Sequence, residues 1–268
     1  MPLPPSASHS LCSSDILWME CLYGDFMGTG MRRCLYVLLA VVVGGAALCL
    51  VQKGQRFMYG SVFSPANRKP PKKLVIVMHG YGSNAGDLWT LGREISKTLP
   101  DVEVHVPHGF DSCEVGGGGY QWFRMGNWTI PEWKEGLAQT KTRFDAYLEP
   151  LIKKYHLSRK DVALVGFSQG AMMALHFGIQ QGVQAIVSFS GILVDPEVLE
   201  GASTCPNILL IHGDADDVLP VKAFFQAQEV LRTHQVSFET LLRPDMGHII
   251  DTESLQKACT FLKEHLAS

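Results

Sequence analysis

From Lys72 onward, two patterns of apolar residues alternate along the chain. Short continuous apolar runs, typical of strands buried on both faces, alternate with stretches in which apolar residues recur every three or four positions. Strands are expected at Leu74–Met78, Val102–Val106, Val162–Val165, Ala185–Phe189, Ile208–Ile211 and Val236–Leu242. Helices are expected at about 87–99, 136–155, 221–234 and 252–266, with another beginning near Gly170. This alternation predicts an α/β fold with a mostly parallel central sheet and helices on both faces.

The run Val162–Val165 leads directly into Gly166-Phe167-Ser168-Gln169-Gly170, followed by small residues that suit a helix start. A G-x-S-x-G corner between strand and helix holds its serine on a strained turn, and the two glycines remove β-carbons that would collide there. The pattern therefore predicts Ser168 as a nucleophile. The alternative is a glycine-rich turn with an incidental serine.

A serine hydroxyl needs a general base, and the base needs a carboxylate that orients it. In α/β-hydrolases these residues follow the serine in the order Asp, then His, after later strands. The strand Ile208–Ile211 runs into a loop with three candidate acids, Asp214, Asp216 and Asp217. The strand Val236–Leu242 runs into His248. Sequence position implies no carboxylate partner for six other histidines of the domain: His105, His108, His156, His176, His212 and His234. His79 is expected to order its own loop.

A long stretch, Asp111–Trp133, combines four consecutive glycines with five aromatic residues. Loops of that length inside a compact domain are usually functional or disordered, and the aromatic content argues against disorder. We expect a folded loop that lines a pocket, with Trp122 and Phe123 in contact with substrate. Packing of these aromatic side chains on the surface is the alternative.

Residues 1–30 show no sustained periodicity and are assigned no fold. Leu35–Val51 then has no charged residue and would span about 26 Å as a helix, a little less than a bilayer core. Residues 31–52 are therefore expected to be a transmembrane anchor or, if Met31 starts the chain, a cleaved signal peptide. A buried core helix is a further alternative. The hydrolase domain is expected over 53–268.

Basic residues are more numerous after this segment than before it, which favours a cytoplasmic location for the domain. The unpaired Cys113, Cys205 and Cys259 point the same way, because free thiols suit a reducing compartment. A cleaved signal peptide would instead export the domain.

Composition narrows the function. The net charge of −3 gives no electrostatic reason to expect a nucleic-acid partner. The seven cysteines form no zinc-type cluster with histidines, so neither a metal nor another cofactor is expected. The oligomeric state is not predicted.

Five ordered motifs carry a resemblance to a known family. They are H-G-Y-G (79–82), G-Y-Q-W-F (119–123), G-F-S-Q-G (166–170), H-G-D-A-D-D-V-L-P (212–220) and M-G-H (246–248). The stretch from about Lys72 to Leu266 resembles the phospholipase/carboxylesterase family, which includes the acyl-protein thioesterases and bacterial carboxylesterases. Ser83 and Arg124 stand where eukaryotic thioesterases usually carry aspartate, so the bacterial carboxylesterase branch fits better.

The resemblance implies residue roles that spacing leaves open. It makes Asp216 the acid of the triad, His248 the base and Asp214 a loop-structuring residue. It also implies an oxyanion hole built from the backbone N–H groups of Tyr81 and Gln169.

The expected function is a serine hydrolase that cleaves carboxylic esters or thioesters of short to medium acyl chains through an acyl-enzyme. Its substrate would be a small ester or an acyl lipid, and residues 35–51 would bring it to the membrane. Lysophospholipase or acyl-protein thioesterase activity is an alternative. A membrane-tethered binding module that has lost turnover is the alternative from another class.

Overall fold

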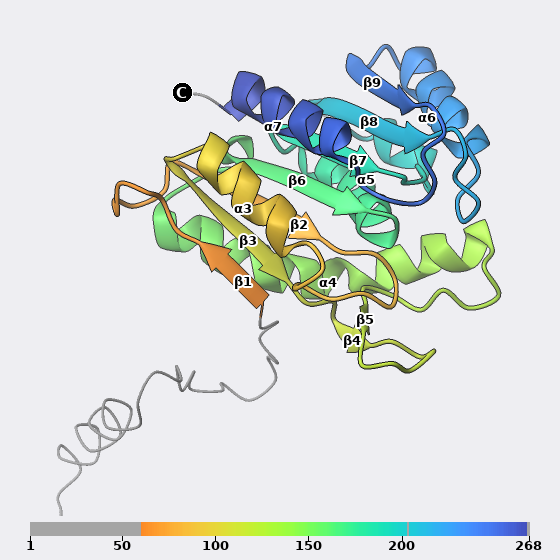
Figure 1. The fold of residues 1–268 in the computed structure, drawn as a ribbon, viewed down its shortest axis with the longest axis horizontal. Coiled ribbons are helices and arrows are strands. Elements are labelled where there is room, and N and C mark those ends of the chain that lie inside the picture. Colours follow the sequence, from red (N-terminus) through yellow and green to blue (C-terminus); the bar gives the residue numbers. More distant parts are fainter. Residues whose placement is uncertain (1–59, 203, 267–268) are drawn as a thin grey trace, which may run out of the picture. The chain divides into compact units, whose positions relative to one another are not determined.

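The computed structural model describes residues 60–202 and 204–266 (Figure 1). The strands are β1 (Gly60–Phe63), β2 (Lys73–Met78), β3 (Val102–Pro107), β4 (Asp111–Ser112), β5 (Tyr120–Gln121), β6 (Val162–Phe167), β7 (Ala185–Phe189), β8 (Asn207–Gly213) and β9 (Phe238–Arg243). The α-helices are α3 (Trp89–Thr98), α4 (Ile130–Tyr155), α5 (Gln169–Gln181), α6 (Lys222–Thr233) and α7 (Thr252–Leu266). Two 3₁₀-helices cover Arg159–Asp161 and Pro196–Leu199.

The expectations for residues 1–30 and 31–52, including the apolar run 35–51, lie outside the described residues. Within the ranges that the structure covers, no helix has both the length and the apolar character needed to span a bilayer.

A seven-stranded sheet forms the centre of the domain, in the order β1-β3-β2-β6-β7-β8-β9. All neighbouring pairs are parallel except β1 with β3, which is antiparallel. The sequence therefore predicted the fold class correctly. Because β6 lies fourth of seven, its carboxyl end opens at the middle of the sheet edge, where ligand sites of open α/β sheets form.

Helices cover both faces of the sheet (Figure 1). One face packs against α3 and α7 through residues such as Ile95 and Phe261. The other packs against α4, α5 and α6 through residues such as Phe144, Phe177 and Phe224. The strand residues of β6 alternate between these two cores, as the period of two along a strand requires. Both faces of the sheet are buried under helices, which explains why the central strands are continuously apolar.

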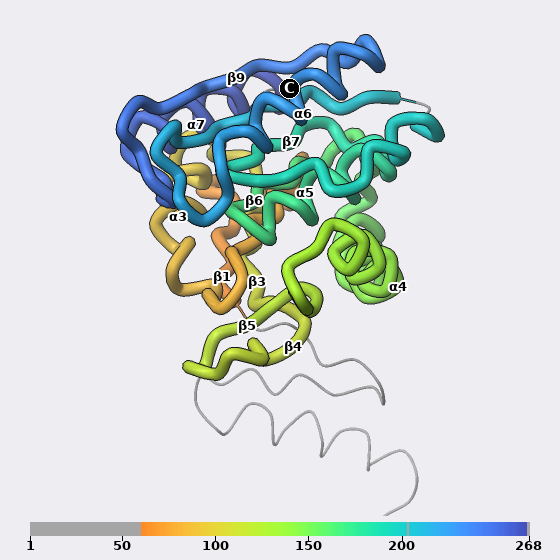
Figure 2. Tube along the Cα trace, turned by 90° about the vertical axis from the view of Figure 1, so that its right-hand side faces the viewer, coloured from red at the N-terminus to blue at the C-terminus, as the bar shows by residue number. Residues whose placement is uncertain are grey.

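The long connection between β3 and α4 is folded, as expected, but it contains a small hairpin. Strands β4 and β5 pair antiparallel, with Asp111 opposite Gln121. Figure 2 shows this hairpin projecting below the sheet between β3 and α4. It is joined to the loop after β2 through a bridge between Ser83 and Tyr120. The hairpin and that loop are therefore held together by backbone hydrogen bonds.

The start of helix α4 and the presence of strand β1 differ most from the sequence expectation. Helix α4 begins at Ile130, six residues before the expected Gly136, because Pro131 occupies the first turn, where its missing N–H is tolerated. Strand β1 was not expected, since Gly60–Phe63 is short and alternates between exposed and half-buried positions.

Candidate active site

Ser168 lies at the turn between β6 and α5, at the carboxyl edge of the sheet. Its backbone has φ 54° and ψ −117°, and its N–H donates to Phe189 O at 2.9 Å. A non-glycine residue held in such a conformation costs on the order of 1–3 kcal/mol and persists only where the surroundings fix it. The corner is thus a strained strand-to-helix turn that raises the serine side chain at the end of the central strand.

Two glycines make this corner possible. A β-carbon on Gly166 would lie 2.1 Å from Gly170 O, and one on Gly170 would lie 2.1 Å from Met78 O. Neither distance is sterically possible, so any larger residue would push the helix away from β2 and β6. The two glycines are required by close backbone packing.

The structure brings His248 and Asp216 together. Nδ1 of His248 lies 2.8 Å from Oδ2 of Asp216, and the two residues come from the loops after β9 and β8. Since an ionised carboxylate only accepts, Nδ1 carries the proton and Nε2 remains available as a base. The imidazole also packs against Phe167, the residue before Ser168, with ring centroids 4.8 Å apart and the ring planes tilted by 42°. His248 therefore lies beside the strained corner.

The carboxylate of Asp216 is held on both oxygens. It is 6 % exposed, and Oδ1 accepts the backbone N–H groups of Val218 at 3.0 Å and Leu219 at 2.8 Å. Burial alone would raise its pKa, but the hydrogen bonds from His248 and Leu219 outweigh burial and leave the pKa of Asp216 below its usual value. Asp216 is accordingly ionised at neutral pH.

The other two candidate aspartates lie elsewhere. Asp214 and Asp217 are both exposed. Oδ1 of Asp214 accepts the backbone N–H of Asp245 at 2.7 Å, which ties the loop after β8 to the loop after β9. The choice among three aspartates, which spacing left open, is thus resolved by geometry toward Asp216 as the partner of His248.

The turn after β2 approaches the serine from the other side. A β-carbon on Gly80 would lie 3.2 Å from Cβ of Ser168. Backbone hydrogen bonds in this turn use the N–H of Gly82, to Tyr120 O at 2.9 Å, and of Ser83, to Gly80 O at 3.2 Å. Gln169 is the first residue of α5, so its N–H has no partner within the helix. Gln169 thus follows Ser168 directly, and Tyr81 follows the glycine that lies against it, while the role of their two amides as an oxyanion hole remains a prediction.

His79 orders this turn from inside. Its Nε2 accepts the N–H of Gly109 at 2.8 Å, so Nδ1 carries the proton and donates to Gly80 O at 2.7 Å. Burial lowers the pKa of His79 to about 4. The residue is a neutral structural bridge, as the sequence suggested.

The side chain of Gln169 connects the corner to the aromatic loop. Its Oε1 accepts the N–H of Trp122 at 2.9 Å, and its Nε2 donates to Phe123 O at 2.8 Å. Nε1 of Trp122 donates in turn to His79 O at 2.8 Å. These buried bonds fix the relative positions of the corner, the turn and the loop, and sequence patterns did not reveal them.

The five aromatic residues of the stretch Asp111–Trp133 differ in burial, and Tyr120 is half-buried. Trp122, Phe123 and Trp133 are buried in the core, and Trp122 is only 1 % exposed. Trp128 is exposed and packs edge-to-face against Tyr81, with centroids 5.8 Å apart. Burial gives Trp122 and Phe123 a structural role, and their contact with substrate stays a prediction.

Three histidines that the sequence left without a carboxylate partner do have one nearby. Nε2 of His105 lies 2.8 Å from Glu103, Nε2 of His212 lies 3.4 Å from Asp216, and Nδ1 of His176 lies 3.9 Å from Asp195. Sequence position did not imply these contacts, and of the three only the one between His105 and Glu103 is a hydrogen bond. The signal was present for the first pair, because residues two apart on a strand share a face.

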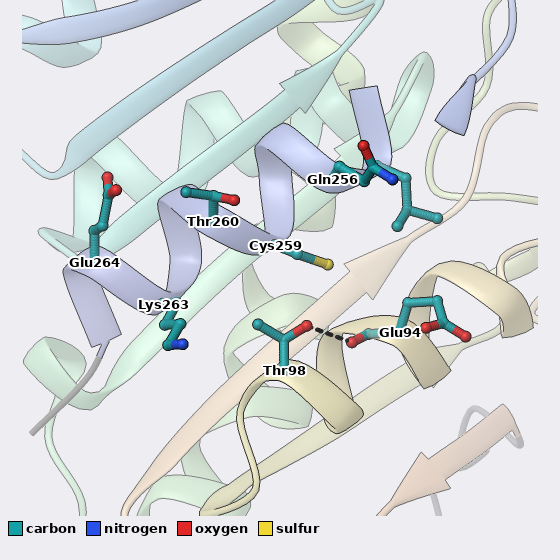
Figure 3. A pocket seen from close by; sticks show the side chains of 8 residues that line it. Glu94, Thr98, Gln256, Cys259, Thr260, Lys263 and Glu264 are labelled. Carbon is teal, nitrogen blue, oxygen red and sulfur yellow. Dashed lines mark hydrogen bonds between the residues drawn. The ribbon is translucent and has the colours of Figure 1, made fainter. Parts of the chain in front are cut away.

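A cavity at the surface of α3 and α7 lies away from these residues. It has a volume of about 890 Å³ and is a groove between α3 and α7, with Cys259 on one helix and Thr98 on the other (Figure 3). A second cavity of about 410 Å³ lies between the aromatic loop and α4, and Trp122 and Phe123 contribute to its wall. Neither is lined by Ser168, Asp216 or His248.

One group of side chains in the described ranges has the spacing of metal ligands. Glu239, Glu264 and His265 converge where β9 meets α7. Lys257 already pairs with Glu239 at 2.5 Å, so that carboxylate is neutralised locally. The group comes from elements that do not carry Ser168, Asp216 or His248.

The parallel sheet with a serine at the strained corner after its central strand defines an α/β-hydrolase of the serine hydrolase class. The chain belongs to the phospholipase/carboxylesterase family, whose model matches residues 61–266. It is therefore a hydrolase that acts on esters. The alternative of a binding module without turnover is not favoured.

Individual relatives agree with this assignment. Esterase YpfH of Escherichia coli (strain K12) is 29 % identical over 206 residues, which cover 73 % of this chain and 84 % of that protein. The crystal structure of esterase PE8 superposes on this chain with a TM-score of 0.74. The two sequences are 33 % identical, and the match covers 78 % of this chain and 100 % of the PE8 chain. The crystal structure of Zea mays acyl-protein thioesterase 2 shares the fold, with a TM-score of 0.56. It is 23 % identical in sequence, and the match covers 78 % of this chain and 100 % of that chain.

Proposed function

We propose that the chain hydrolyses carboxylic esters or thioesters of short to medium acyl chains through an acyl-enzyme on Ser168. The observation that carries this proposal is the 2.8 Å contact between His248 Nδ1 and the buried Asp216, beside the strained serine corner. That arrangement supplies a base with a free Nε2, an acid that stays ionised, and a nucleophile raised at the end of β6.

Each step then has a group to perform it. Ser168 Oγ attacks the acyl carbon while its proton passes to Nε2 of His248, and Asp216 stabilises the resulting imidazolium. The N–H groups of Tyr81 and Gln169 donate to the oxygen that becomes negative in the tetrahedral intermediate. His248 returns the proton to the leaving alcohol or thiol, and water repeats the sequence to release the acid.

Labelling with a fluorophosphonate tests this mechanism directly, because only an activated serine reacts. The intact chain should label, whereas Ser168→Ala and His248→Gln should not. Ser237→Ala, which changes an exposed serine before β9, is the matched control and should label like the intact chain. Labelling that survives in Ser168→Ala would place the reactive serine elsewhere.

We further propose that residues 35–51 anchor the chain in a membrane with the hydrolase domain on the cytoplasmic side. The support is the uncharged run itself and the excess of lysine and arginine after it. Cleavage after a start at Met31 would instead export the domain. Resistance of the full chain to alkaline carbonate extraction, together with intact N-terminal peptides in mass spectrometry, supports the anchor, and a mature chain that begins near residue 48 contradicts it.

A further inference from the structure

The exposed apolar side chains of the domain gather at one edge of the sheet. The connections β2–α3, β3–α4, β8–α6 and β9–α7 each carry at least one of them, counting the first turn of the helix that follows, whereas the connections after β6 and β7 carry none. These side chains are Trp89, Val115, Trp128, Ile130, Val218, Phe225 and Ile249. We call this set the apolar rim. Val62 and Leu242, the remaining exposed large apolar residues of the described ranges, lie within the outer strands β1 and β9.

Members of the rim adjoin the candidate catalytic residues. Ile249 follows His248 directly, Val218 lies two residues after Asp216, and Trp128 packs against Tyr81 with ring centroids 5.8 Å apart. Exposed apolar area next to a site marks a surface that contacts another apolar body. Members of the rim therefore lie next to the candidate catalytic residues.

Ion pairs do not separate the two edges of the sheet. At the amino ends of the strands Lys73 lies 2.8 Å from Asp161, and at the rim edge Arg243 lies 2.9 Å from Asp251. The rim edge is distinguished by its exposed apolar residues.

The chain enters the domain at the rim edge. Gly60, the first residue of β1, pairs with Pro107, the last residue of β3, so β1 begins at the carboxyl edge of the parallel strands. Only residues 52–59 separate this point from the apolar run 35–51, and a fully extended chain of that length spans at most about 30 Å. A membrane anchor in 35–51 would therefore keep Gly60, which lies at that edge, within that distance of the bilayer.

We propose that the apolar rim rests on the bilayer surface, so that the opening of the active site faces the lipid and receives acyl chains from it. This inference rests on the proposed function and its membrane anchor. The exposed Asp214 and Asp217 beside the opening would be repelled by anionic lipid, so the surface that fits is zwitterionic phosphatidylcholine.

The test uses the full chain reconstituted in phosphatidylcholine vesicles and compares two triple variants of equal added charge. The rim variant changes residues from two connections, β3–α4 and β8–α6 with the first turn of each helix, none of them assigned to the catalytic machinery: Val115→Asp, Ile130→Asp and Phe225→Asp. They are 72 %, 45 % and 52 % exposed. The control adds the same charge to exposed positions that lead into β8 and β9 at the opposite edge: Thr204→Asp, Gln235→Asp and Ser237→Asp.

Two substrates separate docking from chemistry. Hydrolysis of an octanoyl ester dissolved in the vesicles should fall at least about tenfold in the rim variant, because three apolar contacts with lipid are lost. Hydrolysis of water-soluble p-nitrophenyl acetate should stay within about twofold, which also shows that the variant folds. The control variant should match the intact chain on both substrates. Equal losses in the two variants, or no loss in either, would overturn the proposal.

A second measurement does not depend on turnover. Brominated phosphatidylcholine quenches indole fluorescence only at close range, so Trp128→Phe should reduce the quenchable fraction of the full chain. Unchanged quenching would exclude contact between the rim and lipid even if no ester is cleaved. If acetate is hydrolysed but the chain does not float with vesicles, the anchor and this inference fail while the proposed hydrolase activity stands.

Discussion

Nε2 of His212 lies 3.4 Å from Oδ2 of Asp216, the same oxygen that accepts the hydrogen bond from His248. Two imidazoles therefore approach one carboxylate. His212 is buried and lies 2.7 Å from Leu219 O, which makes Nε2 its protonated nitrogen. Burial lowers the pKa of His212, so it stays neutral. His212 is positioned to hold the loop after β8, which carries Asp216, and not to take a proton from Ser168.

This difference predicts unequal effects of the same substitution. His248→Gln should lower kcat by on the order of 10⁵–10⁶, because the base is lost. His212→Gln, which keeps a side-chain donor, should lower kcat less than about tenfold and act mainly on stability. Turnover of p-nitrophenyl butyrate and thermal unfolding of both variants check this. A larger loss of kcat in folded His212→Gln would make His212 the base.

Ser168→Ala should abolish turnover, with a loss on the order of 10⁶ in kcat. Ser168→Gly should do the same but also stabilise the fold relative to Ser168→Ala by about 1 kcal/mol, because glycine adopts φ 54° without strain. Urea unfolding of the two variants measures the difference. Equal stability would show that the corner stores no strain at this residue.

Substitution of Asp216 should mainly affect activity, and substitution of Asp214, in the same loop after β8, should mainly affect stability. Asp216→Asn should lose about 10⁴ in kcat through a misoriented histidine. Asp214→Asn should mainly weaken the bond to Asp245 N–H and lower stability by roughly 1 kcal/mol. Kinetics and urea unfolding on both variants decide. The reverse outcome would make Asp214 the acid of the triad.

His79 should make stability depend on pH. Its pKa is about 4 in the folded chain, against the ordinary 6.5, because burial disfavours the charged ring. Between these values the unfolded chain binds a proton that the folded chain does not, so this stabilisation is complete above about pH 6.5 and declines toward pH 4. The loss from this residue should reach roughly 2 kcal/mol at pH 5.

The control is His79→Gln, which cannot titrate. Its free energy of unfolding, measured in urea at pH 7 and pH 5, should change less with pH than that of the intact chain, by about the amount attributed to His79. Identical pH dependence would mean that His79 titrates normally in the folded chain.

Trp122→Phe tests whether the buried indole positions the turn or binds the acyl chain. The substitution removes the donor to His79 O but keeps an aromatic ring. We expect kcat/KM to fall by a similar factor for acetate, butyrate and hexanoate esters, since a 1 % exposed ring has little surface to offer a substrate. A loss that grows with chain length, because each buried methylene contributes about 0.8 kcal/mol, would confirm Trp122 as an acyl contact.

Sequence reasoning succeeded where one local pattern determines structure. The central strands were placed within a residue or two because they are buried on both faces, and the glycines around Ser168 identified the corner. It failed where the structure depends on contacts between residues that are far apart in the sequence. Strand β1 forms only because β3 offers it an edge, and spacing alone could not choose Asp216, since that choice depends on where the loop after β9 delivers His248.

The hairpin beside the turn has two parts that tolerate change very differently. Gly116, Gly117 and Gly118 have φ near +80°, and a β-carbon at any of them would meet nothing within 4 Å. At Gly119 a β-carbon would lie 1.9 Å from Gly82 O, which belongs to the turn that is hydrogen-bonded to β5. An epitope or a reporter sequence inserted at 116–118 should therefore leave the turn beside Ser168 undisturbed, which makes the hairpin tip a practical attachment point close to the active site.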